Sequence, residues 1–115
     1  MDFVASFGLH AGLIVSGQRP VTPAIIDRLP SFKVGLLKNG ELVDEGGGKN
    51  VLRSPALCLG ELATAIGRQA GAEPLAAGEL VSSGTLTTPQ LLHPGEEWRA
   101  QVAGIDLPPL TLTTT

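Results

Sequence analysis

The amino-acid sequence predicts a single α+β domain, residues 1–115, that is mostly β and contains one long helix. Short apolar segments separated by Gly- and Pro-rich turns predict about six strands, mostly antiparallel, in a sandwich or rolled sheet. One central stretch instead repeats apolar residues at spacings of three and four, which is typical of a helix. Because 43% of the 115 residues are apolar, the chain can bury one core.

The first predicted element is a long strand over residues 3–15. This stretch is rich in Val, Phe, Leu and Ile, and its glycines disfavour a helix. A strand with no element before it needs a partner strand from elsewhere or remains an open edge. After a loop, a short helix is predicted from Pro23 to Arg28, with Thr22 as its N-cap.

A β-hairpin is predicted around Asn39-Gly40, because both residues accept the positive φ of a type I′ turn. Alternating apolar residues precede this turn from Ser31 on, and residues 41–45 form the returning strand. The Gly46-Gly47-Gly48 run that follows lacks the pattern of a phosphate-binding loop. We interpret it as a flexible bend, with close approach of the backbone to a ligand as the alternative.

The long helix is predicted to begin at Ser54 and to end at about Gly71. Ser54 is a good N-cap, Pro55 suits the first helical position, and a glycine is common just after a helix. We interpret its apolar stripe as a packing face, formed by Leu59, Leu62, Ala63, Ile66 and Ala70.

The rest of the chain is predicted to be turns and short strands. Leu80-Val81 is a strand-like lead, and His93 begins a surface turn. Residues 98–103 alternate as a strand with one apolar face, and residues 107–112 form a last edge strand. The three threonines at the end are expected to fray.

Charge and cysteine content restrict the partners and the compartment. The net charge of −3 and the lack of a basic run argue against nucleic acid or an anionic membrane as a partner. No apolar run approaches the ~20 residues of a transmembrane helix, and the single cysteine, Cys58, predicts a buried free thiol. We therefore expect a cytoplasmic protein. Only 17% of the residues are charged, so we expect a partner to cover part of the surface and the chain to form a homo-oligomer.

Candidate chemistry lies in residues 80–89, where an apolar lead runs into a glycine between hydroxyl residues. Ser83 and Thr85 flank Gly84, and their hydroxyl and backbone N–H groups can turn toward one point. Such a cluster of neutral donors suits a carboxylate or an enolate oxygen. The alternative is a simple turn, the usual meaning of Ser, Thr and Gly between apolar segments.

Other signs of catalysis are missing from the sequence. It contains no GxSxG or HExxH motif and no Cys/His metal spacing. The acidic pairs Asp44-Glu45 and Glu96-Glu97 are interpreted as solvated strand ends and turns, because neighbours in a strand point to opposite faces.

Four motifs occur together in the order and spacing of one family: DFVASFG at residues 2–8, DEGGGKNVLRSP at 44–55, VSSGTLT at 81–87 and PGEEW at 94–98. On these motifs the chain resembles the C-terminal part of the 2-keto-4-pentenoate hydratases, in the fumarylacetoacetate hydrolase superfamily. The resemblance covers nearly all of this chain but somewhat under half of a complete family member. It implies the family's rolled mixed β-sandwich.

The resemblance also implies a metal-dependent enzyme. Family members hold a divalent ion, Mg²⁺ or Mn²⁺, with three carboxylates upstream of this chain, so no metal ligand and no bound ion are expected on this segment alone. The family's carboxylate-binding turn falls on Ser83, Gly84 and Thr85.

Near the start, the chain departs from the family pattern. Many hydratases carry an Asp-Asn pair followed by Ala-Ser-Ser where this chain has residues 6–10, which indicates a subgroup distinct from the best-known hydratases. His10 lies in this stretch and is expected to line or adjoin the site. It is either a proton relay or a hydrogen-bonded core histidine.

The resemblance therefore predicts part of a hydratase that adds water to a 2-hydroxy-dienoate or 2-keto-4-enoate, with a small 2-keto carboxylic acid as ligand. The alternatives within the superfamily are an acylpyruvate hydrolase and a 2-keto acid decarboxylase. A third alternative is a non-catalytic binding or assembly module, or a truncated fragment, because the metal-binding carboxylates are missing. A Glu-x-Glu motif encoded upstream of Met1 would indicate a fragment of an enzyme, and we expect the 115-residue chain alone to be inactive.

Overall fold

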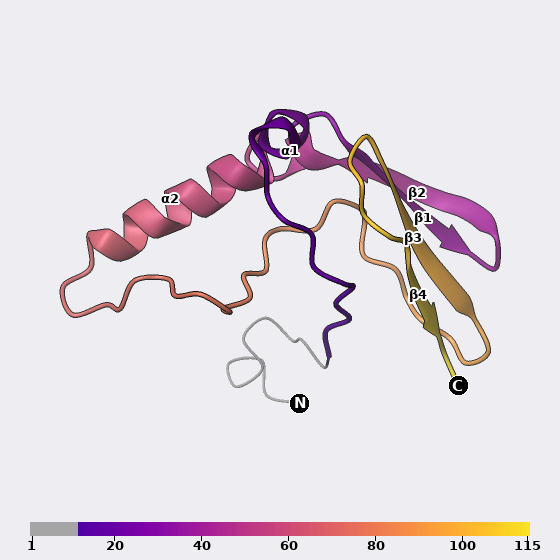
Figure 1. Ribbon diagram of the computed structural model, residues 1–115. Helices are drawn as coiled ribbons and strands as arrows, with labels where there is room; N and C mark the ends of the chain where they lie inside the picture. The colour runs from indigo at the N-terminus through magenta and orange to yellow at the C-terminus, as the bar shows by residue number, and fades with distance from the viewer. Residues whose placement is uncertain (1–11) are drawn as a thin grey trace.

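Residues 12–115 form one four-stranded antiparallel sheet, from which a long helix projects (Figure 1). The computed structural model describes residues 12–115. The strands within that range are β1 (Lys33–Lys38), β2 (Glu41–Gly47), β3 (Glu97–Ala103) and β4 (Leu110–Thr113). Their order in the sheet is β2-β1-β3-β4, so that β2 and β4 are its edges.

β1 and β2 form the predicted hairpin. Asn39 and Gly40 have φ values of 50° and 84°, the positive values that a type I′ turn requires. A register shift between Leu36 and Leu37 interrupts the ladder with a β-bulge or irregularity. β2 continues past the predicted end of the strand to Gly47.

The predicted short helix is also present, as α1 (Pro23–Arg28). The Thr22 hydroxyl caps it by accepting a hydrogen bond from the Ile25 N–H, and Pro23 opens its first turn. The helix then leads through Leu29 into β1.

A small core lies where the chain between α1 and β1 meets the end of β2. Gly48, the first residue of a 3₁₀ turn η1 (Gly48–Asn50), donates its N–H to the Phe32 carbonyl at 3.1 Å. A Cβ at Gly48 would clash with the Leu29 carbonyl and the Phe32 ring. Phe32 and Val51 are buried here, and the third buried apolar side chain among residues 12–115, Trp98, lies at the other end of β1, opposite Lys38.

The glycine run therefore serves close packing, and its interpretation as a flexible bend was wrong. At Gly46 the carbonyl of Leu86 occupies the place that a Cβ would need, and at Gly48 the carbonyl of Leu29 does so. The segments that approach are parts of the chain itself.

The long helix, α2 (Pro55–Gly67), begins as predicted. The Ser54 hydroxyl accepts the Ala56 N–H at 3.3 Å, and Pro55 occupies the first position. The helix ends at Gly67, earlier than predicted, and Gly71 lies beyond it with a φ of 79°. None of its residues is buried, and it points away from the sheet (Figure 1). Its apolar stripe is thus not the core-facing surface that its pattern predicts.

One predicted strand, and the described end of another, are irregular. Leu80-Val81 lies in the long connection from residue 68 to residue 96, which has no helix or strand. Residues 12–15, the described end of the predicted first strand, are irregular, and the rest of that strand lies outside the described residues. The α+β class is confirmed, but residues 12–115 hold four strands in one sheet, against about six predicted.

The C-terminal end is tied to the sheet through Thr114, so the predicted fraying is wrong at this residue. Its N–H donates to the Glu96 carbonyl, and its hydroxyl accepts the Glu96 N–H, both at 2.8 Å. The same hydroxyl donates to the His93 carbonyl at 2.5 Å.

The helices within residues 12–115 are too short or too polar for any of them to cross a membrane.

Candidate functional site

The predicted binding turn lies in the long connection between α2 and β3. We call residues 82–88 the hydroxyl segment. Its first part, including Ser83, Gly84 and Thr85, is exposed. Gly84 has no positive φ, and a Cβ there would meet no atom within 4 Å. Neither the backbone conformation nor the surrounding space at Gly84 therefore requires a glycine.

The hydroxyls of the segment make local hydrogen bonds. Thr85 Oγ1 donates to the Thr87 carbonyl at 2.7 Å and accepts the Thr87 N–H at 3.3 Å. Ser83 Oγ donates to the Gly84 carbonyl at 3.3 Å. Within residues 12–115, the backbone N–H groups of Ser83, Gly84 and Thr85 donate to no acceptor. These three N–H groups can therefore serve a ligand.

Asp44 fixes the hydroxyl segment to β2. Its Oδ2 accepts the Thr88 N–H at 2.7 Å, and its Oδ1 accepts the Glu45 N–H at 2.8 Å. The hydrogen bond from Thr88, followed by that from Glu45, lowers the pKa of Asp44 below its ordinary value. Asp44 is partly exposed, but it also holds a backbone partner 44 positions away in the sequence, which the acidic pair did not indicate.

A groove runs between α2 and the hydroxyl segment, and we call it the α2 groove. Its volume is about 480 Å³. One wall is the apolar side of α2, and the opposite side is the start of the hydroxyl segment. Its lining consists of Pro55, Cys58, Leu59, Leu62, Val81, Ser82, Ser83 and Gly84.

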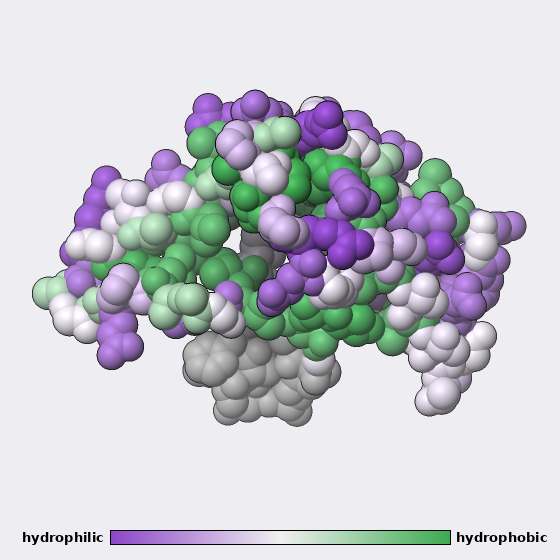
Figure 2. Space-filling model, in the orientation of Figure 1, coloured by the Kyte–Doolittle hydropathy of each residue, from purple (hydrophilic) through white to green (hydrophobic). Residues whose placement is uncertain are grey.

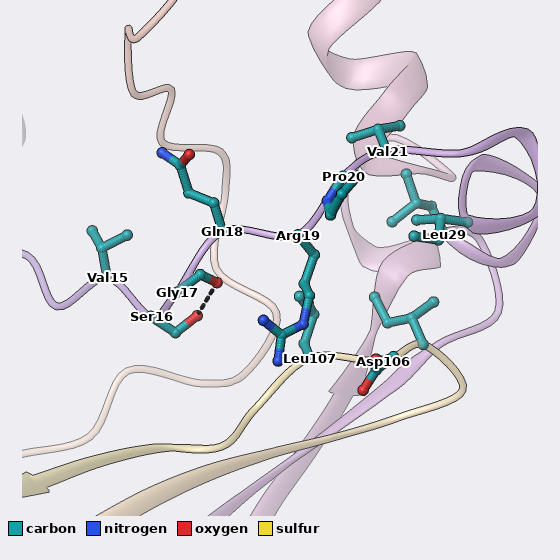
Figure 3. A pocket seen from close by; sticks show the side chains of 12 residues that line it. Val15, Ser16, Gly17, Gln18, Arg19, Pro20, Val21, Leu29, Asp106 and Leu107 are labelled. Atoms are coloured by element: carbon teal, nitrogen blue, oxygen red, sulfur yellow. Dashed lines mark hydrogen bonds between the residues drawn. The ribbon is translucent and has the colours of Figure 1, made fainter.

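A second cavity, of about 390 Å³, lies between the chain before α1 and residues 105–107 (Figure 3). Its lining is mostly apolar, and the Arg19 side chain extends toward Leu107 across it. Among residues 12–115, the Arg19 guanidinium forms no ion pair. This cavity is therefore a second place where a carboxylate with an apolar part could bind.

Glu96 anchors a separate polar cluster that joins β1 to β3. Its Oε2 lies 2.7 Å from Lys38 Nζ, and its Oε1 accepts the His93 N–H at 2.5 Å and the Trp98 indole N–H at 3.4 Å. The hydrogen bond from Lys38 and then that from His93 lower the pKa of Glu96 to about 2. Lys38 Nζ also lies 5.8 Å from the centroid of the Trp98 ring.

This cluster is structural. Glu96 is only 7% exposed, which contradicts its interpretation as a solvated residue, and both of its oxygens are already paired. The His93 side chain is 67% exposed in a turn, as predicted.

The structure thus keeps Ser83, Gly84 and Thr85 together but does not place His10, which lies outside the described residues. Sequence reasoning missed Asp44 and the α2 groove. The DEGGG motif contains Asp44 and Gly46, but no local pattern indicates that both contact the hydroxyl segment. Within residues 12–115, no three His, Cys, Asp or Glu side chains gather where they could hold a metal ion.

Two curated proteins are similar to this chain: the 2-keto-4-pentenoate hydratase of Paraburkholderia xenovorans (strain LB400) and the 2-keto-4-pentenoate hydratase 3 of Pseudomonas putida. Each is 32% identical to it over 105 residues, which are 91% of this chain and 38% of the relative. The predicted resemblance is confirmed, although the chain spans well under half the length of these relatives. No family model and no solved structure matches the chain.

Proposed function

We propose that this chain is the C-terminal, ligand-holding part of a metal-dependent hydratase that adds water to a 2-hydroxy-dienoate or a 2-keto-4-enoate. The observation that carries the proposal is the similarity of 91% of the chain to two 2-keto-4-pentenoate hydratases. The hydroxyl segment adds support, because it presents neutral donors on an exposed stretch that a carboxylate can reach.

The proposed task of the hydroxyl segment is to bind the carboxylate of the 2-keto acid. A carboxylate accepts hydrogen bonds at both oxygens, and the N–H groups of Ser83, Gly84 and Thr85 supply several donors within one short stretch. The Thr85 hydroxyl can join them only if its hydrogen turns away from the Thr87 carbonyl. The negative charge of Asp44 is turned to the Thr88 and Glu45 amides.

The Mg²⁺ or Mn²⁺ ion implied by the resemblance does not fit the residues of this chain that the structure describes. Asp44 is occupied by two N–H groups, and Glu96 by Lys38 and His93. No group of three His, Cys, Asp or Glu side chains within residues 12–115 could hold a metal ion. We therefore propose that the ion belongs to the remaining part of a complete enzyme, where it would supply Lewis-acid chemistry.

The proposal includes the fold and assembly of the complete protein. A rolled mixed β-sandwich would add the second layer that the single sheet of residues 12–115 lacks. We expect a cytoplasmic homo-oligomer, because the lone, half-buried thiol of Cys58 suits a reducing compartment and exposed apolar residues need a cover. The net charge of −3 favours a small-molecule ligand over nucleic acid or an anionic membrane.

Acylpyruvate hydrolysis and 2-keto acid decarboxylation remain the alternatives, because each also needs a site for a 2-keto carboxylate. Assays of the complete parent protein against a 2-hydroxy-dienoate, an acylpyruvate and a 2-keto acid, the last followed by the release of CO2, distinguish the three activities. We expect turnover of the dienoate. Turnover of none of the three substrates would leave a non-catalytic binding or assembly module, or a truncated fragment.

Calorimetric titration of the 115-residue chain with 2-ketopentanoate tests the binding step, with the neutral methyl ester as the comparison. We expect the acid to bind more tightly than the ester. The variants Thr85→Val and Arg19→Gln locate the carboxylate, because they alter the hydroxyl segment and the second cavity separately. A loss of affinity in Arg19→Gln alone would move the carboxylate site to the second cavity.

A further inference from the structure

The α2 groove has a polar end and an apolar wall. Ser83 and Gly84 form the polar end, and both present backbone N–H groups without an acceptor among residues 12–115. Leu59 and Leu62 stand in the wall, 46% and 36% exposed. Figure 2 shows apolar residues gathered over α2 and the chain that follows it. Covering such side chains is favourable, so a ligand that lies along this wall gains free energy from apolar contact.

We propose that the α2 groove holds the hydrocarbon tail of the ligand whose carboxylate binds the hydroxyl segment. The inference rests on the proposed function, and it names the ligand class: 2-keto acids with an apolar tail of several carbons. Leu59 and Leu62 would contact the tail and determine its length.

The volume of the α2 groove is large enough for a 2-keto acid with a tail of several carbons. One water molecule occupies about 30 Å³ of liquid, so a groove of about 480 Å³ holds far more than a carboxylate and its keto group. A ligand of the size of pyruvate would leave most of the apolar wall uncovered. A longer tail would fill it, at about a fourfold gain in affinity for each methylene that becomes fully buried.

Cys58 provides a direct report on this groove. It is the only cysteine of the chain, it is half-buried, and it lines the groove from α2. A tail that lies along the wall must cover part of this thiol. The rate at which iodoacetamide alkylates Cys58, measured by mass spectrometry, therefore shows whether a ligand occupies the groove.

The experiment compares pyruvate, 2-ketohexanoate and the methyl ester of 2-ketohexanoate with the 115-residue chain. We expect 2-ketohexanoate to bind at least about tenfold more tightly than pyruvate, since it adds three methylenes to an open groove. We also expect it to slow the alkylation of Cys58, whereas pyruvate at equal occupancy does not. The variant Leu62→Ser should lose most of the preference for the longer acid. The matched control is Leu57→Ser, which changes a leucine of the same helix that is 48% exposed and does not line the groove.

The outcomes separate this inference from the proposed function. If both acids bind equally and Cys58 stays reactive, the tail lies elsewhere and the inference is wrong, while the carboxylate site stands. If the ester binds and protects Cys58 as well as the acid does, the groove is supported and the carboxylate site is overturned. If neither acid binds, both are wrong. Equal effects of Leu62→Ser and Leu57→Ser would also overturn the inference, because they would reflect the helix and not the groove.

Discussion

The carboxylate of Asp44 on β2 accepts the backbone N–H of Thr88 at 2.7 Å and so attaches the hydroxyl segment to the sheet. Close beside this contact, the carbonyl of Leu86 lies against Gly46 of the same strand. Because the stretch from residue 68 to residue 96 has no helix or strand, it has no ladder of its own to hold it. The position of the candidate site thus depends on these two contacts with β2.

Replacing Asp44 by alanine should release the hydroxyl segment. The amides of Thr88 and Glu45 would lose their acceptor, so their hydrogen exchange should become faster, and affinity for a 2-keto acid should fall. Exchange measured by NMR or mass spectrometry checks this at each amide. Glu41→Ala is the matched control, because Glu41 is an exposed acid of the same strand. Equal exchange at Thr88 in both variants would show that Asp44 does not hold the segment.

Gly46→Ala should destabilise the fold, by about 1–3 kcal/mol, because the new Cβ would collide with the backbone carbonyl of Leu86. A backbone group cannot turn aside as a side chain can. The free energy of unfolding in urea measures the effect. Gly84→Ala is the control within the hydroxyl segment itself, where a Cβ meets open space, and its effect should stay within about 0.5 kcal/mol. Similar effects of the two substitutions would mean that the approach of Leu86 to β2 is not tight.

The sequence predicted those elements whose causes are local. Asn39-Gly40 makes its turn through its own backbone conformation, and Thr22 and Ser54 cap helices with hydrogen bonds that reach three and two residues along the chain. Such rules operate inside a window that can be read directly, which is why the hairpin and both helix starts were correct.

The errors concern contacts between distant residues. Asp44 and Glu96 stand in acidic pairs that are usually solvated, yet each finds a partner far along the chain, Thr88 and Lys38. Thr114 was expected to fray because nothing near it in the sequence requires order, whereas it bonds to Glu96, 18 positions earlier. The hydroxyl segment could be identified from its composition, but the wall of α2 beside it could not, because that depends on how the chain returns from the helix.

Acid should weaken the fold through Glu96. Its pKa is lowered from 4.5 to about 2, so its contribution to stability is complete above pH 4.5 and is lost as the pH falls through about 2. The pKa of Asp44 is also lowered, from its ordinary value of 3.8, so protonation of Asp44 below pH 3.8 should destabilise the fold as well. Urea unfolding from neutral pH downward measures this loss.

Two variants test the assignment to Glu96. The difference in stability between the unmodified chain and Glu96→Gln should shrink as the pH falls from 4.5 toward 2. Glu97→Gln is the control, since that neighbouring carboxylate is exposed and accepts no hydrogen bond among residues 12–115. A difference for Glu96→Gln that is constant with pH would contradict the account of the cluster.

The 115-residue chain should associate with itself in solution. Leu42 on the edge strand β2 is 59% exposed, and Leu91 in the long connection is 82% exposed, so contact between copies can bury apolar area. Sedimentation over a range of concentrations measures the association. Leu42→Glu should weaken it, whereas Glu41→Gln on the same strand should leave it unchanged or strengthen it. A monomer at high concentration would contradict the prediction.

Thr85→Val should weaken the binding of a 2-keto acid by about 1–3 kcal/mol, because it keeps the shape of the side chain and removes a donor to a charged acceptor. The structure adds a second effect: the hydroxyl also bonds to the carbonyl and the N–H of Thr87, so the variant should lose about 0.5–1.5 kcal/mol of stability. Affinity by calorimetry and unfolding in urea, both on this one variant, measure the two effects separately.

Thr85→Ser decides between a binding role and a purely local one. Serine restores the hydroxyl, so both the affinity and the stability should return toward those of the unmodified chain. If Thr85→Val lowers stability while affinity stays the same, the hydroxyl serves only the turn with Thr87, and Thr85 leaves the site. If affinity falls and the serine variant restores it, the Thr85 hydroxyl donates to the ligand. In that case Arg19→Gln in the second cavity should have no effect on binding.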